Sequence, residues 1–506
     1  MTTPAKPHRL TAEELLDLAL DDGSFQRWDQ PLAYPQDAVS GASDDYIAQL
    51  LAAAEKSGVD ESVITGEGSL NGRRIAILVS EFRFLAGSIG KNAADRIVAA
   101  VQRATAEGLP LVAAPSSGGT RMQEGTPAFV QMVDISKAVT AHKAAGLPYL
   151  VYLRHPTTGG VMASWGSLGQ VTAAEPKAMI GFLGPRVYEA LFKKPFPPDV
   201  QTAENLYKHG IIDAVVPPQQ IGRLLEKVLR ITGAADNPIR ASRPDLTVTS
   251  VDDLPQTDVW DSVLISRRLE RPGVRDLLRV AATDVIPLNG TSEGERDPGL
   301  LLALASFGSH PCVVLGQDRR LQTAATPLGP QALRVARRGM RLATELQLPL
   351  VTVIDTPGGA LSPEAEEGGL AGEIARCLAE LSTVRTPTVT LMLGEGTGGA
   401  ALALLPADRV IAAQHSWLSP LPPEGASAIV YRDIDHAPQM ARDQQISCRD
   451  LVIAKVINVV VLEQPDAADE PTEFCHRLSQ TLQYELERLE RVPMQSLLTA
   501  RGVPWA

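Results

Sequence analysis

Cysteine is scarce in this sequence, and the few cysteines present are scattered. The 506 residues include four, Cys312, Cys377, Cys448 and Cys475, and no two of them form a C-x-x-C pair. Zinc ribbons and disulfide frameworks both need closely spaced cysteines, so the sequence predicts neither, and it predicts no metal site. A chain without a disulfide framework suits a reducing compartment, and we therefore expect a cytoplasmic protein.

Aromatic residues, positive net charge and long apolar runs are also lacking. Phe, Trp and Tyr make up 4% of the chain, and the formal net charge is −12. Nucleic-acid binding depends on clustered basic side chains, often with aromatic rings that stack on bases, so we expect no nucleic-acid partner. No apolar run approaches the ~20 residues of a membrane-spanning helix, and no signal peptide precedes the first helix, so we expect no membrane association.

The chain does have a large apolar content, 44%, which is enough for a core, and it has 41 glycines that punctuate the sequence. Length alone allows two or three domains. An internal repeat favours two, because similar segments recur 239 or 240 positions apart. The matched pairs are Leu109-Pro110 with Leu348-Pro349, Gly118-Gly119 with Gly358-Gly359, Pro148 with Pro387, and Gly159-Gly160 with Gly398-Gly399.

A duplicated fold is the interpretation that we carry forward. The alternative is that two unrelated α/β domains happen to share Leu-Pro and Gly-Gly punctuation. Each half alternates short β-branched runs with helical stretches, which predicts an α/β fold. A Pro-, Asp- and Ser-rich stretch separates the halves. The predicted organisation is an N-terminal domain over 1–235, a linker over 236–260 and a C-terminal domain over 261–506.

Two helix signals stand outside the repeat. Thr11 and Glu14 have the spacing of a capping box, which predicts a helix start near the N-terminus. Apolar residues at helical spacing predict a packed helix near the C-terminus. They are Phe474, Leu478, Leu482, Leu486 and Leu489.

The glycine pairs are the candidate sites. A Gly-Gly between a strand and a helix permits positive φ and opens the backbone to a ligand, and the first N–H groups of the helix have no intrahelical acceptor. Those donors lie at the positive end of the helix dipole and can stabilise a developing oxyanion. Gly159 with Gly160, and Gly398 with Gly399 and Ala400, are therefore candidate oxyanion holes. The simpler alternative is that these glycines only allow tight packing.

One motif suggests a different chemistry. Gly394, Gly396 and Gly399 form a G-x-G-x-x-G pattern, which is typical of dinucleotide-binding folds. That fingerprint also needs an acidic residue at the end of the next strand, where this chain has Gln414 and His415. The first half lacks the pattern altogether, so we set nicotinamide chemistry aside.

Enolate chemistry also needs a base. Glu395 lies beside one glycine pair, and His155 and Glu175 flank another. None of the three has an equivalent in the other half, and each could equally be a cap or a surface residue. The residues alone therefore leave the identity of the base open.

Longer motifs resemble a known family. Residues 116–125, 146–187 and 206–216 resemble the β subunit of the bacterial acetyl-CoA carboxylase carboxyltransferase, with "SGGTRMQE" and "EPKAMIGFLGPRV" the most specific runs. Residues 348–376, 391–404 and 419–432 resemble its α subunit, through "IDTPGG", "GEGTGGA" and "PEG". The chain thus resembles the fused, single-chain carboxyltransferase of biotin-dependent acyl-CoA carboxylases in actinobacteria.

The resemblance implies two crotonase-like ββα-spiral domains related by internal duplication. It implies that Gly159 and Gly160 hold the thioester oxygen of acyl-CoA, and that Gly399 and Ala400 hold the ureido oxygen of carboxybiotin. The biotin anion, once CO2 has left, would take the α-proton, so no side-chain base is required. No biotin attachment motif occurs here, and carboxybiotin would arrive on a separate carrier protein, with no cofactor bound covalently to this chain.

Further residues are carried over by the same resemblance. Arg121, Lys177 and Arg186 are candidate contacts for the CoA phosphates, or else surface or interface ion pairs. Leu402 lies where the family sets acyl-chain preference. The remaining candidate substrate-binding positions shape the two pockets and are Gly118, Gly119, Gly358, Gly359 and Gly398. The expected partners are a biotin carboxylase or biotin carboxyl carrier subunit and further copies of the chain, as a dimer or hexamer.

Two departures from the family pattern, and several alternatives, accompany these expectations. The four-cysteine zinc ribbon of two-subunit relatives is missing, and the loop after "DTPG" differs slightly from the usual form. The predicted reaction converts acetyl-CoA to malonyl-CoA in fatty acid biosynthesis. Propionyl-CoA or another acyl-CoA as substrate, a biotin-dependent decarboxylase and a non-catalytic assembly subunit remain as alternatives.

Overall fold

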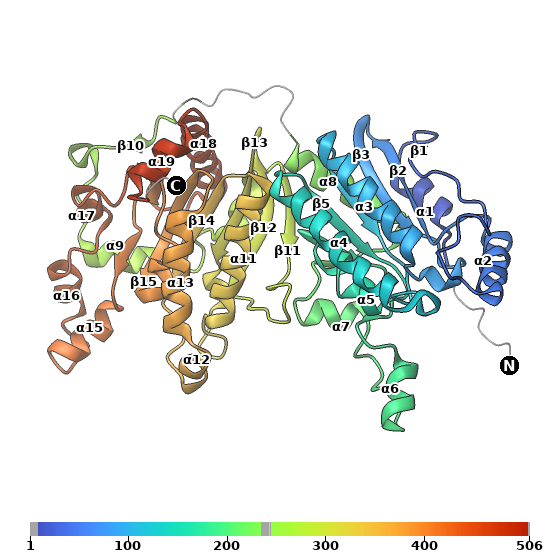
Figure 1. Ribbon diagram of the computed structural model, residues 1–506. Helices are drawn as coiled ribbons and strands as arrows, with labels where there is room; N and C mark the ends of the chain where they lie inside the picture. The colour runs from blue at the N-terminus through green and yellow to red at the C-terminus, as the bar shows by residue number, and fades with distance from the viewer. Residues whose placement is uncertain (1–8, 234–241, 243, 504–506) are drawn as a thin grey trace, which may run out of the picture. The chain divides into compact units, whose positions relative to one another are not determined.

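The computed structural model describes residues 9–233, 242 and 244–503, although it leaves out the side chains of 185 and 186. The chain forms two compact units. The first comprises Met1–Leu229 with Ser292–Gly294, and the second comprises Arg230–Thr291 with Glu295–Ala506. Each unit is built on its own sheet, and each is described separately below (Figure 1).

The first unit has a seven-stranded sheet in the order β1-β2-β3-β4-β5-β7-β9. The first three strands pair antiparallel and the rest pair parallel. The strands are β1 (Gln26–Arg27), β2 (Val63–Leu70), β3 (Arg73–Ser80), β4 (Leu111–Ala114), β5 (Tyr149–Leu153), β7 (Val171–Ala174) and β9 (Ala214–Val215), with β6 (Thr157–Thr158) and β8 (Ile180–Gly181) paired separately. Near-continuous burial of β3, β4 and β5 fits parallel strands covered by helices.

Two long helices of the first unit, α3 (Lys91–Ala106) and α4 (Gly125–Ala144), pack side by side (Figure 1). The short α6 (Pro185–Phe192) stands away from the body of the unit. The predicted capping box is confirmed, since Thr11 and Glu14 exchange both hydrogen bonds at the start of α1. The remaining helices are α1 (Ala12–Ala19), α2 (Asp44–Ser57), α5 (Gly159–Met162), α7 (Ala203–Lys208) and α8 (Ile221–Thr232).

The second unit has a nine-stranded sheet whose main path is β10-β18-β16-β15-β14-β13-β12-β11, with β17 pairing to β15. The strands are β10 (Thr247–Val248), β11 (Asp284–Leu288), β12 (Leu300–Phe307), β13 (His310–Gln317), β14 (Leu350–Thr356), β15 (Thr388–Thr397), β16 (Arg409–Ala413), β17 (Trp417–Ser419) and β18 (Val459–Val461). Strands β13 to β16 and β18 run parallel, as β3 to β5, β7 and β9 do in the first unit.

Helices α11 (Pro330–Leu346) and α13 (Leu370–Thr383) of the second unit pack side by side, as α3 and α4 do in the first. The apolar stripe predicted near the C-terminus lies on α18 (Pro471–Glu490), and all five of its residues are buried in the core of this unit. The other helices are α9 (Val259–Ser266), α10 (Val274–Ala281), α12 (Pro363–Glu367), α14 (Gly398–Leu402), α15 (Pro423–Val430), α16 (Ala437–Asp443), α17 (Cys448–Ile453) and α19 (Met494–Ala500).

The register of the strands repeats between the units. Leu111 lies opposite Tyr149 across β4 and β5, and Leu350 lies opposite Thr388 across β14 and β15. Both residues of the second pair stand 239 positions after those of the first. The equal order and direction of these strands, with the same register in the central pair, support the duplication inferred from the sequence, and the alternating strands and helices confirm the α/β prediction.

The segment predicted as a linker, 236–260, falls partly outside the described residues. The part from 244 onward carries β10, which pairs antiparallel with β18, and the start of α9, so it folds onto the second unit. In the part of the chain that the structure describes, no helix is both long and apolar enough to cross a bilayer.

Candidate active site

The two glycine pairs of the first unit meet backbone to backbone. Gly119 has φ +106°, and a Cβ added there would lie 3.2 Å from Gly159 Cα and 3.4 Å from Gly160 N. A residue with a side chain would therefore push the two loops apart, and the positive φ favours glycine independently. Gly118 donates its N–H to Ala86 O over 2.9 Å, which anchors this loop.

Gly159 and Gly160 open the short helix α5. Gly159 has φ +61°, and its N–H donates to Phe182 O over 3.0 Å. Among the described residues, no acceptor satisfies the N–H of Gly160. A Cβ on Gly160 would lie 2.6 Å from Thr120 Oγ1 and 3.5 Å from Met132 Cγ, so the site excludes any side chain. Gly160 thus presents a backbone donor that a ligand oxygen can accept.

The second unit repeats this arrangement. Gly358 and Gly398 have φ values of +129° and +67°, and Gly398 begins α14. A Cβ on Gly399 would lie 2.7 Å from Ile374 Cδ1. Within the described ranges, no acceptor satisfies the N–H groups of Gly399 and Ala400. The predicted glycine positions therefore come together in each unit, beside helix N-termini where the N–H groups of Gly160, Gly399 and Ala400 have no acceptor among the described residues.

The structure corrects the alignment of the first glycine pair. Gly119 N–H donates to Ser117 Oγ over 3.0 Å, and Gly358 N–H donates to Thr356 Oγ1 over 3.1 Å, in the same turn. Gly119 is therefore equivalent to Gly358, at an offset of 239, and the sequence pairing of Gly118 with Gly358 at 240 is wrong. Residue Thr120 takes the place of Gly359.

Arg121 does not lie at a phosphate site. Its side chain is 1% exposed and is paired with the buried carboxylate of Glu61. All of its donors point at protein atoms: Nε at Ser88, one terminal nitrogen at Tyr46, Glu61 and Glu124, and the other at Glu61, Ser62 and Ser88. A guanidinium satisfied in this way cannot reach CoA, so the predicted phosphate contact is wrong for Arg121, and the residue instead forms an ion pair inside the unit.

Comparison with known proteins decides the family. The model of the carboxyl transferase domain matches residues 6–497. The chain belongs to the carboxyl transferase family. The resemblance seen in the motifs is thereby confirmed.

Relatives with similar sequences carry more specific names. The chain is 57% identical over 494 residues to the probable biotin-dependent acyl-coenzyme A carboxylase beta3 subunit of Mycobacterium tuberculosis, with 97% of each chain covered. It is 35% identical over 511 residues to the acetyl-coenzyme A carboxylase carboxyl transferase subunits beta/alpha of Salinispora arenicola, covering 97% of this chain and 89% of the relative.

Solved structures with the same fold include a transcarboxylase 12S bound to methylmalonyl-coenzyme A, with a TM-score of 0.71 at 21% identity, covering 94% of this chain and 90% of that one. A single-chain, multi-domain long-chain acyl-CoA carboxylase matches with a TM-score of 0.70 at 17% identity, covering 95% of this chain and 46% of that one. These likenesses confirm the crotonase-like α/β fold expected from the sequence.

The other two candidate phosphate contacts of this carboxyl transferase differ from Arg121. Lys177 is exposed in a turn with φ +59°, where its backbone N–H donates to Glu204 Oε1. Arg186 lies on α6, and its side chain is outside the part of the structure that is described. Leu402, at the end of α14, is 44% exposed beside Gly399 and Ala400.

The three candidate bases are occupied by structural contacts. Nδ1 of His155 accepts the backbone N–H of Met179, and burial lowers the pKa of this histidine. Glu175 accepts the backbone N–H of His155. The carboxylate of Glu395 pairs with Arg267 at 2.7 Å. Each of the three therefore has a structural contact that accounts for its presence.

The dinucleotide-like pattern in the second unit has a packing explanation. A Cβ on Gly394 would lie 2.8 Å from Asp355 Oδ1, and one on Gly396 would lie 2.8 Å from Trp417 O. Gly399 is crowded by Ile374, as described above. Each glycine thus has a close neighbour that a Cβ would approach, and this packing accounts for the pattern without a bound nucleotide.

Two buried side chains near the second glycine loop escaped the sequence analysis. Gln317 Nε2 donates to Ala400 O over 2.8 Å, and its Oε1 accepts the N–H of Asp355. Asp355 is the acid of the "DTPG" motif, so the motif itself carried a signal that the sequence analysis did not use. Gln317 ends an unremarkable apolar strand, and nothing in the sequence marked it.

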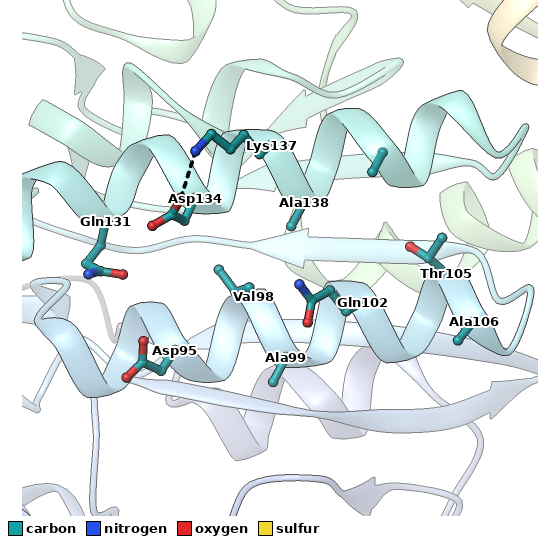
Figure 2. A pocket seen from close by; sticks show the side chains of 11 residues that line it. Asp95, Val98, Ala99, Gln102, Thr105, Ala106, Gln131, Asp134, Lys137 and Ala138 are labelled. Carbon is teal, nitrogen blue, oxygen red and sulfur yellow. Dashed lines mark hydrogen bonds and ion pairs between the residues drawn. The ribbon is translucent and has the colours of Figure 1, made fainter.

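A groove between α3 and α4 is separate from these loops (Figure 2). It has a volume of about 730 Å³, and its walls come from those two helices alone. Val98, Ala99 and Ala138 are among its lining residues, and Lys137 pairs with Asp134 at its edge. None of the predicted site residues lines it.

Proposed function

We propose that this carboxyl transferase moves the carboxyl group of carboxybiotin, delivered on a separate carrier protein, to the α-carbon of an acyl-CoA. The observation that carries the proposal is the repeated glycine loop, which in each unit presents unused backbone N–H donors at the start of a short helix. The relatives named as acyl-CoA carboxylase subunits support biotin and acyl-CoA as the two substrates.

The first unit holds the acyl-CoA. The thioester oxygen accepts the N–H of Gly160 and gains negative charge as the enolate forms. A backbone donor held rigidly at such an oxygen is worth a factor of about 10²–10³ in rate. Gly159 supports this donor, because its positive φ turns the chain into α5 and its own N–H is anchored on Phe182.

The second unit holds carboxybiotin. Its ureido oxygen accepts the N–H groups of Gly399 and Ala400, and Gln317 fixes α14 by donating to Ala400 O. Carboxybiotin, once bound, supplies both the CO2 and the group that takes the α-proton. The protein then contributes orientation and backbone donors, which agrees with the structural roles found for His155, Glu175 and Glu395.

We infer a composite site, in which the first unit of one protomer faces the second unit of another. Exposed apolar side chains occur at equivalent positions in both units, directly after the first glycine pair and on α6 and α15, a pattern typical of surfaces that a partner covers. The equivalent pairs are Met122 with Leu361, Leu191 with Ile429, and Phe192 with Val430. The transcarboxylase 12S named above forms a hexamer, and a dimer or a hexamer is the assembly expected here.

The finer proposal is conversion of acetyl-CoA to malonyl-CoA for fatty acid biosynthesis in the cytoplasm, with a biotin carboxylase or carrier subunit as partner. Leu402 beside the second loop leaves an apolar surface for a short acyl group. Propionyl-CoA is the second candidate substrate, since its additional methyl group is also apolar.

The test is a panel of acyl-CoAs supplied with a carboxylated biotin carrier. We expect malonyl-CoA from acetyl-CoA or methylmalonyl-CoA from propionyl-CoA. Absence of product from every acyl-CoA would contradict the proposal and favour a non-catalytic assembly subunit. Net decarboxylation of malonyl-CoA or methylmalonyl-CoA, with no carboxylation under any condition, would instead favour a decarboxylase.

A further inference from the structure

Asp355 is a buried carboxylate with poor compensation. It lies at the end of β14, is 4% exposed, and its Oδ1 has no hydrogen-bond partner among the described residues. The nearest cation is Arg319, on the turn η6 (Arg319–Leu321), whose Nε lies 3.8 Å from Oδ2. A buried carboxylate without a close partner destabilises the folded protein, so we expect Asp355 to have a functional role.

The carboxylate touches the strand that leads to the second glycine loop. Its Oδ1 is 2.8 Å from the place where a Cβ on Gly394 would stand, so it packs directly against the backbone of β15. Gly394 lies on β15, which leads directly into Gly398 at the start of α14. Any movement of the Asp355 side chain therefore reaches the segment that presents the donors of Gly399 and Ala400.

Arg319 connects Asp355 to a second group of contacts near the end of β15. Its terminal nitrogens donate to the carbonyl oxygens of Ser266 and Arg268, which flank Arg267. Arg267 in turn pairs with Glu395, next to Gly394, and with Glu424 at the start of α15. The strand end is thus braced by Asp355 from one side and by the Arg267 pair from the other, and Arg319 connects the two.

The charged surroundings of Asp355 are completed by two residues. Glu395 opposes its ionisation, and Arg271, which is paired with Glu463 and Asp466, favours it. The backbone N–H of Glu395 also favours the charged form without making a well-formed hydrogen bond to Oδ1. Burial is the largest influence, and it raises the pKa of the Asp355 carboxyl to about 6.

We propose that Asp355 is a positioning residue, whose ionised carboxylate holds Arg319 and the end of β15 so that the second glycine loop keeps the geometry required for carboxybiotin. The expected effect on activity rests on the proposed function. The expected effect on the melting temperature does not depend on that function, because a carboxylate kept for positioning should lower the stability of the folded protein.

The test compares Asp355→Asn and Asp355→Ser with the wild-type protein. Serine is the residue that the first unit has at this place, Ser116. We expect both variants to melt at a higher temperature than wild type at pH 7.5, and to lose about tenfold in kcat/KM for free carboxybiotin while the KM for acyl-CoA changes less than twofold. The matched control, Ser116→Ala, should leave the KM for carboxybiotin unchanged.

The pH dependence supplies a second measurement. Because the pKa of Asp355 is higher in the folded protein than in the unfolded chain, wild type loses stability relative to Asp355→Asn as the pH rises from about 4 to 6, and the difference stays constant above that range. A lower melting temperature for both variants, an unchanged kcat/KM for carboxybiotin, or equal changes in both KM values would overturn the proposal. A wild-type protein without any turnover would contradict the proposed function and leave the melting comparison as the test.

Discussion

Ser116 in the first unit and Asp355 in the second stand at the same place after equivalent strands, yet they support the glycine loops differently. Ser116 donates its hydroxyl to His155 O over 3.0 Å, a neutral hydrogen bond to the segment that follows β5. Asp355 presses a carboxylate against Gly394, which is the equivalent of His155. The same backbone is thus held by a neutral contact in one unit and by a charge in the other.

The charged side chain of Asp355 lowers the stability of the folded protein. A pKa raised from 3.8 to about 6 means that ionised Asp355 costs the folded protein on the order of 3 kcal/mol at neutral pH. Ser116 carries no such cost. Only one of the two duplicated loops therefore has a buried carboxylate that destabilises the fold. We expect the two loops to differ in what they bind.

The largest expected effects come from filling the two loops. Gly160→Val places atoms against Thr120 and Met132, and Gly399→Val places them against Ile374, so in each variant the helix N-terminus or the side chain beside it must move. We expect kcat to fall at least 10²–10³-fold in either variant, with Gly160→Val acting on acyl-CoA and Gly399→Val on carboxybiotin. Steady-state assays with each substrate varied in turn measure the difference.

The matched control is Gly184→Ala, in a position where a Cβ meets nothing within 4 Å. It should retain full activity. If Gly160→Val and Gly399→Val impaired both substrates equally while melting like wild type, the division of labour between the units would be wrong.

The next largest effect is expected when the buried ion pair of either unit is broken. Arg121 with Glu61 in the first unit corresponds in kind to Arg271 with Glu463 in the second, and all four side chains are almost fully buried. Glu61→Gln leaves a buried guanidinium short of its partner and should cost about 3–5 kcal/mol of unfolding free energy. Urea denaturation measures this loss, and activity assays below the transition should show an unchanged KM for acyl-CoA.

Glu463→Gln is the counterpart and should destabilise by a similar amount. A Glu61→Gln variant that kept its stability but bound acyl-CoA weakly would restore Arg121 as a phosphate contact.

A smaller effect concerns the ends of the two short helices. Leu402 ends α14, and the equivalent position after α5 is Ala163; both are exposed. Replacing Leu402 by Ala makes the second helix resemble the first. We expect the ratio of kcat/KM for propionyl-CoA over acetyl-CoA to change by about tenfold, because one apolar contact is worth ~1–3 kcal/mol in selectivity. Ala163→Leu is the control, and a larger change there than at Leu402 would contradict the assignment.

Much of this comparison was predictable from the sequence, because it depends on local signals. Gly-Gly punctuation, Leu-Pro boundaries and the capping box of Thr11 each report backbone conformation at their own position. The pairing of Gly118 with Gly358 failed because two adjacent glycines look alike in sequence, whereas φ and the Ser117 hydrogen bond distinguish them. The environment of Arg121 was also beyond reach, since Glu61 and Tyr46 approach it only through folding.

The smallest effect tests whether the first unit alone carries a cation for CoA. Lys177 is exposed in the first unit, and the equivalent position of the second is the buried His415. Lys177→Asn, which tolerates the positive φ, should raise the KM for acyl-CoA about two- to fivefold, and less at high salt, because exposed charges are screened. Lys177→Arg should restore the KM. Lys137→Ala, at the groove between α3 and α4, should leave the KM unchanged, and an equal effect of both lysines would mean that net charge and not a specific contact governs CoA binding.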